Sequence, residues 1–350
     1  MTASACILGC QGPRLTADER AFFGEARPWG FILFARNVES LDQLRALTDE
    51  LREAVGQESA LVFVDQEGGR VQRLHPPLAA RRPPAARFGA LHERDPEAAE
   101  EAAFLNHRLI AHELQAAGID ADCAPCLDIG HPEGHGVIGD RAFSSRSSVV
   151  AALGRAAVDG LMAGGVAPVI KHMPGHGRAE LDTHLEMPRV STSVQMLEAT
   201  DFEPFRALAD APMGMTGHVS FDAADPGVAA TVSHRTIATV IRGLIGFDGL
   251  LMSDDLSMKA LGGSIGDRTR AAIEAGCDVA LHGNGALVGE PVRDLMAELA
   301  AVAENAGELR GRAAERAAEA RASARTRQPF DPEAAEARLA ELGLGAMAHA

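Results

Sequence analysis

The chain has 350 residues, of which 46% are hydrophobic and 23% charged. That is enough to bury either two medium domains or one large α/β barrel. The formal net charge is −16 and the sequence pI is about 5.2. Such an acidic surface repels phosphate backbones and anionic membranes, so nucleic acid is not an expected partner.

The apolar segments are too short to cross a membrane. None approaches the ~20 residues of a membrane-spanning helix, so no membrane association is expected. Residues 1–20 show no basic segment followed by a long apolar run, so we expect no signal peptide. The five cysteines form no dense, even framework, and the sequence therefore predicts reduced thiols in the cytoplasm. They are Cys6, Cys10, Cys123, Cys126 and Cys277.

Eight short apolar runs follow one another along the chain. They are largely apolar rather than strictly alternating, which is typical of parallel strands buried on both faces. The predicted strands are residues 5–10, 30–35, 60–66, 119–129, 166–172, 212–219, 249–255 and 277–283.

Amphipathic segments separate these runs. The segment at 40–56 has Ser40 as a plausible N-cap and Gly56 as a plausible stop. Similar segments occupy residues 96–118, 147–165, 233–246 and 266–276. Eight strands with interleaved helices predict a single (β/α)8 TIM-like barrel of the α/β class. The alternative, an open doubly wound sheet, needs fewer strands and usually a Gly-rich first turn that is absent here.

Two segments depart from the alternating pattern. Residues 74–90 form a Pro-rich loop that leads into the helical segment at 96–118. From about residue 290 the chain is rich in Ala, Glu and Arg, and we expect extra C-terminal helices packed on the outside of the barrel. The predicted organisation is therefore a barrel over residues 1–300 and a helical extension over residues 301–350.

Polar side chains gather where the predicted strands end. The strand ends carry Asp65, Asp128, the pair Lys171–His172, His218 and the pair Asp254–Asp255. The carboxyl ends of barrel strands meet at one rim, where barrel enzymes carry their chemistry. Each group taken alone could be a cap or a loop ion pair, but five strands ending in this way predict an active site at that rim.

The pair Asp254–Asp255 supplies a candidate nucleophile. A carboxylate below the anomeric carbon of a sugar can form a covalent glycosyl intermediate that water then resolves. Strand alternation would place Asp254 and Asp255 on opposite faces, but it does not tell which face points inward.

The segment "HMPGHGRAELDTH" offers a second catalytic group. Its Gly and Pro residues predict a long loop, and the loop carries Asp182 and His184. A histidine is a competent acid or base near neutral pH, and a neighbouring carboxylate can orient its ring. His176 and Lys171 could bind hydroxyl groups or shape the loop.

Metal sites are the competing interpretation. Cys123, Cys126, His131 and His135 superficially resemble a zinc site, but the intervening stretch is far shorter than in a zinc finger. Strand alternation would also point the two cysteines to opposite faces. A catalytic metal on His172, His176 and His184 is a further alternative, although no His-x-His pair ends an early strand.

The segment "KHMPGHGRAELDTHLEMP" resembles the signature of bacterial β-N-acetylhexosaminidases of glycoside hydrolase family 3, roughly K-H-F-P-G-H-G-x4-D-S-H-x3-P. The stretches "VDQEGGRVQRL", "VIGDRAF" and "LMSDDLSMKAL" match three further family stretches in the same order. The resemblance covers about residues 5–290. Met173 stands where Phe is usual and Thr183 where Ser is common, and neither changes a chemical role.

The resemblance implies roles for particular residues. Asp254 would be the nucleophile and His184 the acid/base, assisted by Asp182. The groups that hold the N-acetylglucosamine ring would be Asp65, Arg73, Arg141, Lys171 and His172. It also implies a retaining two-step mechanism without a metal or cofactor. A histidine acid/base keeps one negative charge out of the second step, which would suit an anionic acceptor or substrate.

The implied substrate is a small carbohydrate or muropeptide, N-acetylglucosamine-anhydro-N-acetylmuramic acid with or without its peptide. The implied role is cell-wall recycling in the cytoplasm, by a monomer or weak homodimer. Two alternatives stay open. A β-glucosidase-like member of the family would take its acid from a second domain, for which we expect no room in the chain. A metal-dependent barrel hydrolase would lose activity on chelation.

Overall fold

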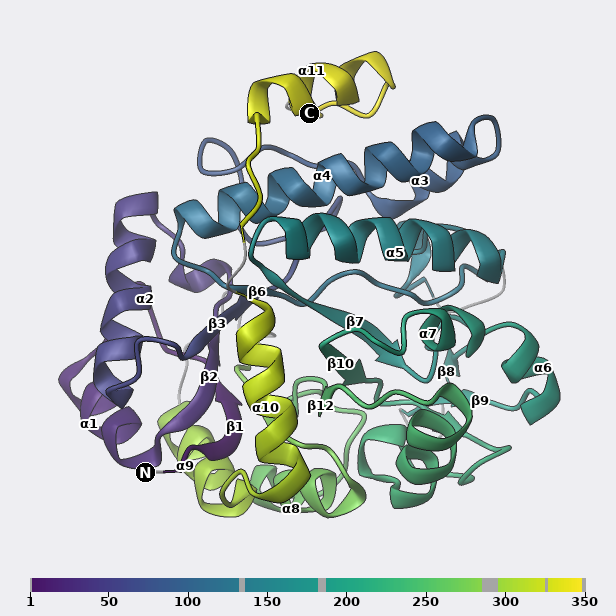
Figure 1. Ribbon diagram of the computed structural model, residues 1–350. Coiled ribbons are helices and arrows are strands. Elements are labelled where there is room, and N and C mark those ends of the chain that lie inside the picture. The colour runs from purple at the N-terminus through teal and green to yellow at the C-terminus, as the bar shows by residue number, and fades with distance from the viewer. Residues whose placement is uncertain (1, 132–135, 182–186, 285–294, 325–326, 348–350) are drawn as a thin grey trace.

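The computed structural model describes residues 2–131, 136–181, 187–284, 295–324 and 327–347. Eight strands form one parallel sheet in the order β12-β10-β7-β6-β3-β2-β1-β13. A parallel bridge between Met252 and Val279 joins the two edges, and the amide of Ser253 donates to the carbonyl of Val279 at 3.1 Å. The eight-stranded TIM-like barrel predicted from the sequence is confirmed (Figure 1).

Each predicted strand overlaps one strand of the barrel. The barrel strands are β1 (Ser4–Leu8), β2 (Pro28–Ile32), β3 (Leu61–Val64), β6 (Ala121–Asp122), β7 (Ala167–Met173), β10 (Met213–Thr216), β12 (Leu250–Met252) and β13 (Ala280–His282). The predicted strand at 119–129 is much too long, because β6 has only two residues. Pro125 follows shortly after it and has no N–H to donate to a ladder, although Cys126 still forms a parallel bridge with Lys171.

Helices surround the barrel because their apolar faces cover the outer side of the strands (Figure 1). They are α1 (Ala17–Ala26), α2 (Leu41–Val55), α3 (Ala85–His92), α4 (Pro96–Ala116), α5 (Ser147–Ala163), α6 (Val194–Ala199), α7 (Glu203–Ala207), the π-helix η4 (Thr236–Ile245), α8 (Ile265–Ala275) and α9 (Leu295–Ala306). The predicted cap of α2 is confirmed, since the Ser40 hydroxyl accepts from the amide of Gln43 and Gly56 ends the helix with a φ of 62°.

Short elements project from the strand ends. The hairpin β4–β5 follows β3, and a small sheet of β8, β9 and β11 follows β7 and β10. The bounds of these strands are β4 (Gln66–Gly68), β5 (Val71–Gln72), β8 (Glu180–Leu181), β9 (Pro188–Val190) and β11 (Ser220–Phe221), and the short turns are η1 (Ala35–Asn37), η2 (Gly139–Arg141) and η3 (Ala230–Val232).

Two further helices follow α9. Helix α10 (Gly311–Ser323) lies across the barrel (Figure 1) and contacts β7 and β12. Its Arg316 donates to the carbonyl of Asp248 and its Arg321 to the carbonyl of Trp29, so it covers the amino ends of the strands. Helix α11 (Pro332–Glu341) packs on α4. A boundary between barrel and extension at residue 300 stays a prediction, and α9 continues across that position.

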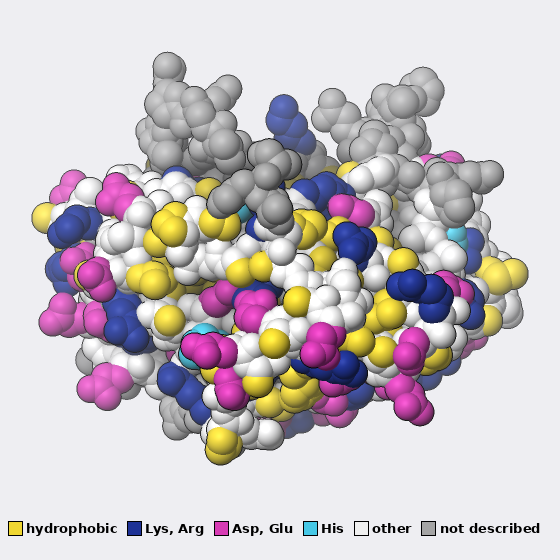
Figure 2. All heavy atoms as spheres, turned by 90° about the horizontal axis from the view of Figure 1, so that it is seen from above, with side chains coloured by type: hydrophobic (Ala, Val, Ile, Leu, Met, Phe, Trp, Pro, Cys, Tyr) yellow, Lys and Arg dark blue, Asp and Glu magenta, His cyan; other side chains and the backbone are white. Residues whose placement is uncertain are grey.

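The described part of the chain contains no helix that is long and apolar enough to span a membrane. Acidic and basic side chains are interspersed over the face seen in Figure 2. All five cysteines are buried and unpaired.

Candidate active site

A cavity of about 210 Å³ opens at the carboxyl ends of the barrel strands. This volume lies below the roughly 300–1,000 Å³ of sites for drug-sized ligands, so it fits a sugar ring better than a long oligosaccharide. The cavity is lined by Ile32, Phe34, Asp65, Val71, Arg73, Val137, Arg141, Lys171, His172, His176, Met215, Asp254, Asp255, Met258 and Leu281. Six predicted site residues therefore meet in one cavity.

A larger groove of about 830 Å³ lies elsewhere on the surface. It is lined by Arg52, Gly56 and Asp120 among others. Gly56 leads into β3 and Asp120 directly precedes β6, so the groove lies at the amino ends of the strands. Barrel enzymes carry their chemistry at the opposite end, and we therefore assign the candidate site to the smaller cavity.

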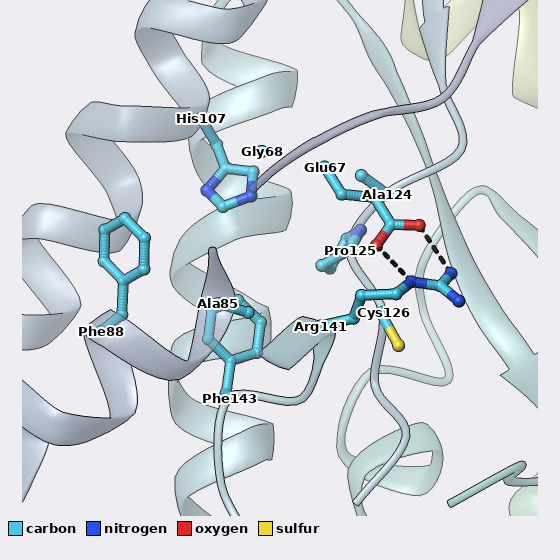
Figure 3. A pocket seen from close by; sticks show the side chains of 10 residues that line it. All are labelled: Glu67, Gly68, Ala85, Phe88, His107, Ala124, Pro125, Cys126, Arg141 and Phe143. Carbon is cyan, nitrogen blue, oxygen red and sulfur yellow. Dashed lines mark hydrogen bonds and ion pairs between the residues drawn. The ribbon is translucent and has the colours of Figure 1, made fainter. Parts of the chain in front are cut away.

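One wall of the cavity is a network of buried ion pairs, with Lys171 at its centre. The ammonium of Lys171 lies 2.7 Å from Asp65 Oδ1 and 2.7 Å from Glu67 Oε1. Asp65 Oδ2 also accepts from Arg73 Nη2 at 3.0 Å. Glu67 accepts two bonds from Arg141, at 2.8 and 2.7 Å, which Figure 3 shows. The side chain of Lys171 is 2% exposed, so its charge depends on these two carboxylates.

The pKa values follow from this network. Burial alone would raise the pKa of Glu67, but Lys171 and Arg141 outweigh it and lower the pKa to about 2. For Asp65, burial is likewise outweighed by Lys171 and Arg73, which hold its pKa below the ordinary range. Burial lowers the pKa of Lys171, and the two carboxylates more than reverse that shift. All three groups are therefore ionised at neutral pH, and the wall is a fixed array of charges.

Next to this wall, Asp128 orients His172. The imidazole donates from Nδ1 to Asp128 Oδ2 at 2.6 Å, which leaves Nε2 directed at Arg141 Nη2, 3.4 Å away. The other oxygen of Asp128 accepts from the amide of His176 at 2.6 Å. Burial raises the pKa of Asp128, but the charge and hydrogen bond of His172 outweigh it and lower the pKa. Asp128 thus fixes the ring that faces the sugar-sized cavity.

Asp254 lies on the wall contributed by β12. Both Asp254 and Asp255 line the cavity, because β12 ends at Met252 and strand alternation no longer applies. Asp254 Oδ1 accepts from the amide of Asp255 at 2.7 Å. The carbonyl of Asp255 in turn accepts from His218 Nε2 at 3.1 Å. The structure therefore directs the Asp254 carboxylate into the same cavity as the cationic groups.

Two predicted residues, Asp182 and His184, lie outside the described residues. They stand in the chain between β8 and β9, which pair antiparallel with Leu181 opposite Pro188. His218 supports the backbone rather than lining the cavity. Sequence reasoning missed Glu67 as a site residue. Residues two apart on an extended strand point to the same side, and this spacing relates Glu67 to Asp65.

In the described part of the chain, one group of side chains is close enough together to hold a metal ion. Donor atoms of Cys126, Asp128 and His172 lie within 4.8 Å of one another. They already bond to each other, with Cys126 Sγ donating to Asp128 at 3.2 Å. The guanidinium of Arg141, 3.4 Å from His172, disfavours a cation there. Cys123 and His131 do not join this group, and His135 lies outside the described residues.

A second cavity, of only about 10 Å³, lies behind Glu67 and Arg141 (Figure 3). Such a volume holds about one water molecule, so it cannot take a sugar. His107 lines it, and burial lowers the pKa of His107 to about 4. The imidazole is therefore neutral at neutral pH, and this cavity belongs to the packing behind the ion-pair wall.

Comparisons with known proteins show the family of the chain. The family model for the glycosyl hydrolase family 3 N-terminal domain matches residues 14–320. A β-hexosaminidase of Alkalilimnicola ehrlichii is 44% identical over 285 residues, covering 80% of this chain and 81% of the relative. A β-hexosaminidase of Xylella fastidiosa is 39% identical over 310 residues, covering 87% and 90%.

Solved structures give the same result. The native NagZ of Neisseria gonorrhoeae has a TM-score of 0.79 and 33% identity, with 98% of each chain covered. A complex of that NagZ with N-trifluoroacetyl-D-glucosamine has a TM-score of 0.78. The chain therefore belongs to glycosyl hydrolase family 3, on its β-N-acetylhexosaminidase branch, and is a glycosidase.

Proposed function

We propose that the protein removes terminal β-linked N-acetylglucosamine by a retaining two-step reaction with Asp254 as the nucleophile. The observation that carries the proposal is the shared cavity, in which the Asp254 carboxylate faces the wall formed by Asp65, Arg73, Arg141, Lys171 and His172. That wall supplies donors and acceptors for a hydroxyl-rich ring.

In the first step, an oxygen of Asp254 attacks the anomeric carbon while the bond to the leaving oxygen breaks. We assign proton delivery to the leaving oxygen to His184, with Asp182 as the group that orients its ring. In the second step, water attacks the glycosyl-aspartate, the ester bond breaks, and His184 takes the proton of the water. The assignment of Asp182 and His184 rests on the sequence motif.

The residues of the wall bind and do not react. Asp65 accepts from ring hydroxyls, whereas Arg73, Arg141 and Lys171 donate. Each of its three cations, Arg73, Arg141 and Lys171, pairs with Asp65 or Glu67, so the wall presents charges that are fixed in place. The fixed geometry reduces reorganisation when charge develops at the anomeric carbon.

Muropeptide fragments are the substrate we favour within this activity. Two of the four exposed large apolar side chains in the described part of the chain, Val137 and Met258, line the cavity. They offer an apolar rim to the leaving group, which suits the anhydro ring and lactyl methyl of such fragments. All five cysteines are unpaired, which supports a reducing compartment, and we place the reaction in the cytoplasm.

The test is hydrolysis of an aryl N-acetyl-β-glucosaminide by the wild-type protein and by Asp254→Ala. Removing the nucleophile should lower kcat by ~10³-fold or more. Asp49→Ala is the matched control, since Asp49 is exposed at the other end of the barrel. A variant at Asp254 as active as the control would remove the assignment.

A further inference from the structure

The hairpin β4–β5 is tied to the Pro-rich segment that follows it. The hairpin contains Glu67 and is followed directly by Arg73. The side chain of Gln72 accepts from the amide of Arg82 at 3.2 Å and donates to the carbonyl of Ala80 at 2.7 Å. The amide of Gly69 donates to the carbonyl of Arg82 at 2.9 Å. Residues 80–84 therefore form a backing for the hairpin.

The contact between hairpin and backing leaves no free space. Gly68 and Gly69 have φ angles of 94° and 58°, which favour glycine. A Cβ on Gly68 would lie 2.6 Å from the carbonyl oxygen of Pro83, and one on Gly69 would lie 2.7 Å from Pro84 Cβ. Because the backbones touch, a displacement of residues 80–84 is passed to the hairpin and to Glu67.

The C-terminal segment holds this backing from its outer side. Arg82 is 1% exposed, and its guanidinium pairs with Glu113 of α4 at 2.5 Å and with Glu336 of α11 at 2.7 Å. The amide of Met347 donates to the carbonyl of Arg81 at 2.9 Å. Helix α11 lies outside α4, far along the chain from the hairpin (Figure 1).

A buried guanidinium is sensitive to the loss of a partner. Desolvation of an unpaired buried charge is costly, so removal of one partner displaces the charge or its surroundings. Burial raises the pKa of Glu113, although Arg82 opposes that rise, which shows that Glu113 is itself poorly solvated. Without Glu336, the Arg82 side chain is no longer held by α11. We expect the backbone of residues 80–84 to shift together with Arg82.

We propose that α11 and the residues after it, as far as Met347, form a C-terminal clamp that positions the sugar-binding hairpin. Glu336 is a positioning residue that acts through Arg82 on Glu67 and Arg73. The inference rests on the proposed function, because it assigns sugar binding to the wall that contains Arg73. It gives α11, which follows the barrel in the chain, a part in substrate binding.

The experiment compares Glu336→Ala with Arg338→Ala in the full-length chain. Arg338 is on the same helix and pairs with Glu101 of α4 at 2.8 Å, in a bond that does not touch Arg82. Glu336→Ala should raise KM for the aryl N-acetyl-β-glucosaminide about tenfold and change kcat less than about threefold, the pattern of lost uniform binding. Arg338→Ala should leave both constants within about twofold. Glu336→Gln removes the charge that pairs with Arg82 and should raise KM in the same direction as Glu336→Ala.

All variants are assayed at a temperature at which circular dichroism shows each of them folded. Equal KM values for Glu336→Ala and Arg338→Ala, or an unchanged KM in Glu336→Ala, would overturn the clamp. If Glu336→Ala does not fold, Glu336→Gln and Arg338→Gln are compared in the same way. If the wild-type protein does not hydrolyse the aryl N-acetyl-β-glucosaminide, the proposed function is wrong, whereas the clamp is still open to test. The clamp is then tested by the rise in Tm that N-acetylglucosamine causes, which Glu336→Gln should reduce and Arg338→Gln should not.

Discussion

The two sides of the cavity are built differently. The wall around Lys171 is a closed set of buried ion pairs, with both Asp65 and Glu67 within 2.7 Å of one ammonium. On the β12 side, Asp254 is half-buried and, among the described residues, its carboxylate accepts a single hydrogen bond, from the amide of Asp255. A carboxylate with a cation at each oxygen, such as Asp65, holds its place, whereas a carboxylate with an oxygen open to the cavity can react. Binding and chemistry are thus divided between the two sides.

This comparison predicts that Asp254→Asn loses activity without losing stability. The amide is nearly the same size and can still accept from the amide of Asp255, but it is not a nucleophile. We expect kcat to fall ~10³-fold or more and Tm to stay within about 1 °C, which corresponds to less than ~1 kcal/mol in a chain of this size. Activity assays and thermal denaturation measure the two quantities. A large fall in Tm would show that Asp254 is part of the structural network.

Lys171→Met, on the ion-pair side of the cavity, should lower both activity and stability. The substitution leaves two buried carboxylates without their shared cation, which costs about 3–5 kcal/mol in comparable buried pairs. We expect kcat/KM to fall about 100-fold, together with a clear fall in Tm. Lys259→Met is the control, because Lys259 is the other lysine of the chain and is exposed. Stability equal to that of the control would contradict the network.

Asp128→Asn tests whether Asp128 orients the imidazole of His172. The amide would present one acceptor instead of two to the amide of His176 and the imidazole of His172. We expect kcat/KM to fall about tenfold, with a change in the ring tautomer of His172 that is visible in ¹⁵N NMR spectra. Asp222→Asn serves as the control, because Asp222 pairs with Arg189 at the surface. An unchanged His172 spectrum would show that Asp128 does not orient the ring.

A further carboxyl group, Asp122, supports the hairpin from below. It accepts from the amide of Gln66 at 2.9 Å, and burial raises its pKa from 3.8 to about 8. The folded chain therefore holds a proton that the unfolded chain releases between these values. The free energy of unfolding should fall as the pH rises through this window, by up to ~1.4 kcal/mol per pH unit.

Asp122→Asn should remove this contribution to the pH dependence. The free energy of unfolding is measured by urea denaturation at pH 5 and pH 7.5. Relative to the wild type, the value for the variant should be about 1 kcal/mol or more higher at pH 7.5 than at pH 5. The same difference in stability at both pH values would mean that Asp122 titrates normally.

The sequence predicts the barrel well because its strands are buried on both faces. All eight apolar runs overlap a barrel strand, and Ser40 and Gly56 bound α2 as expected. Strand lengths are less predictable. The run at 119–129 is largely apolar, but only two of its residues pair regularly, since apolarity reports burial and not hydrogen bonding.

The candidate site is only partly readable from the sequence. The convergence of Asp65, Lys171, His172 and Asp254 follows from strand order in a barrel. The inward direction of Asp254 does not, because it lies beyond the end of β12. The attachment of Glu336 to Arg82 joins residues 254 positions apart, and no local pattern contains such a pairing.

The central claim is that Asp254 becomes covalently bound to the sugar. The direct measurement is mass spectrometry of the protein incubated with a fluorinated N-acetylglucosaminide whose glycosyl-enzyme hydrolyses slowly. The account predicts one added glycosyl unit, located by proteolysis on the peptide that contains Asp254 and absent from Asp254→Asn. Turnover of the reagent without any adduct, or an adduct on another residue, would contradict it.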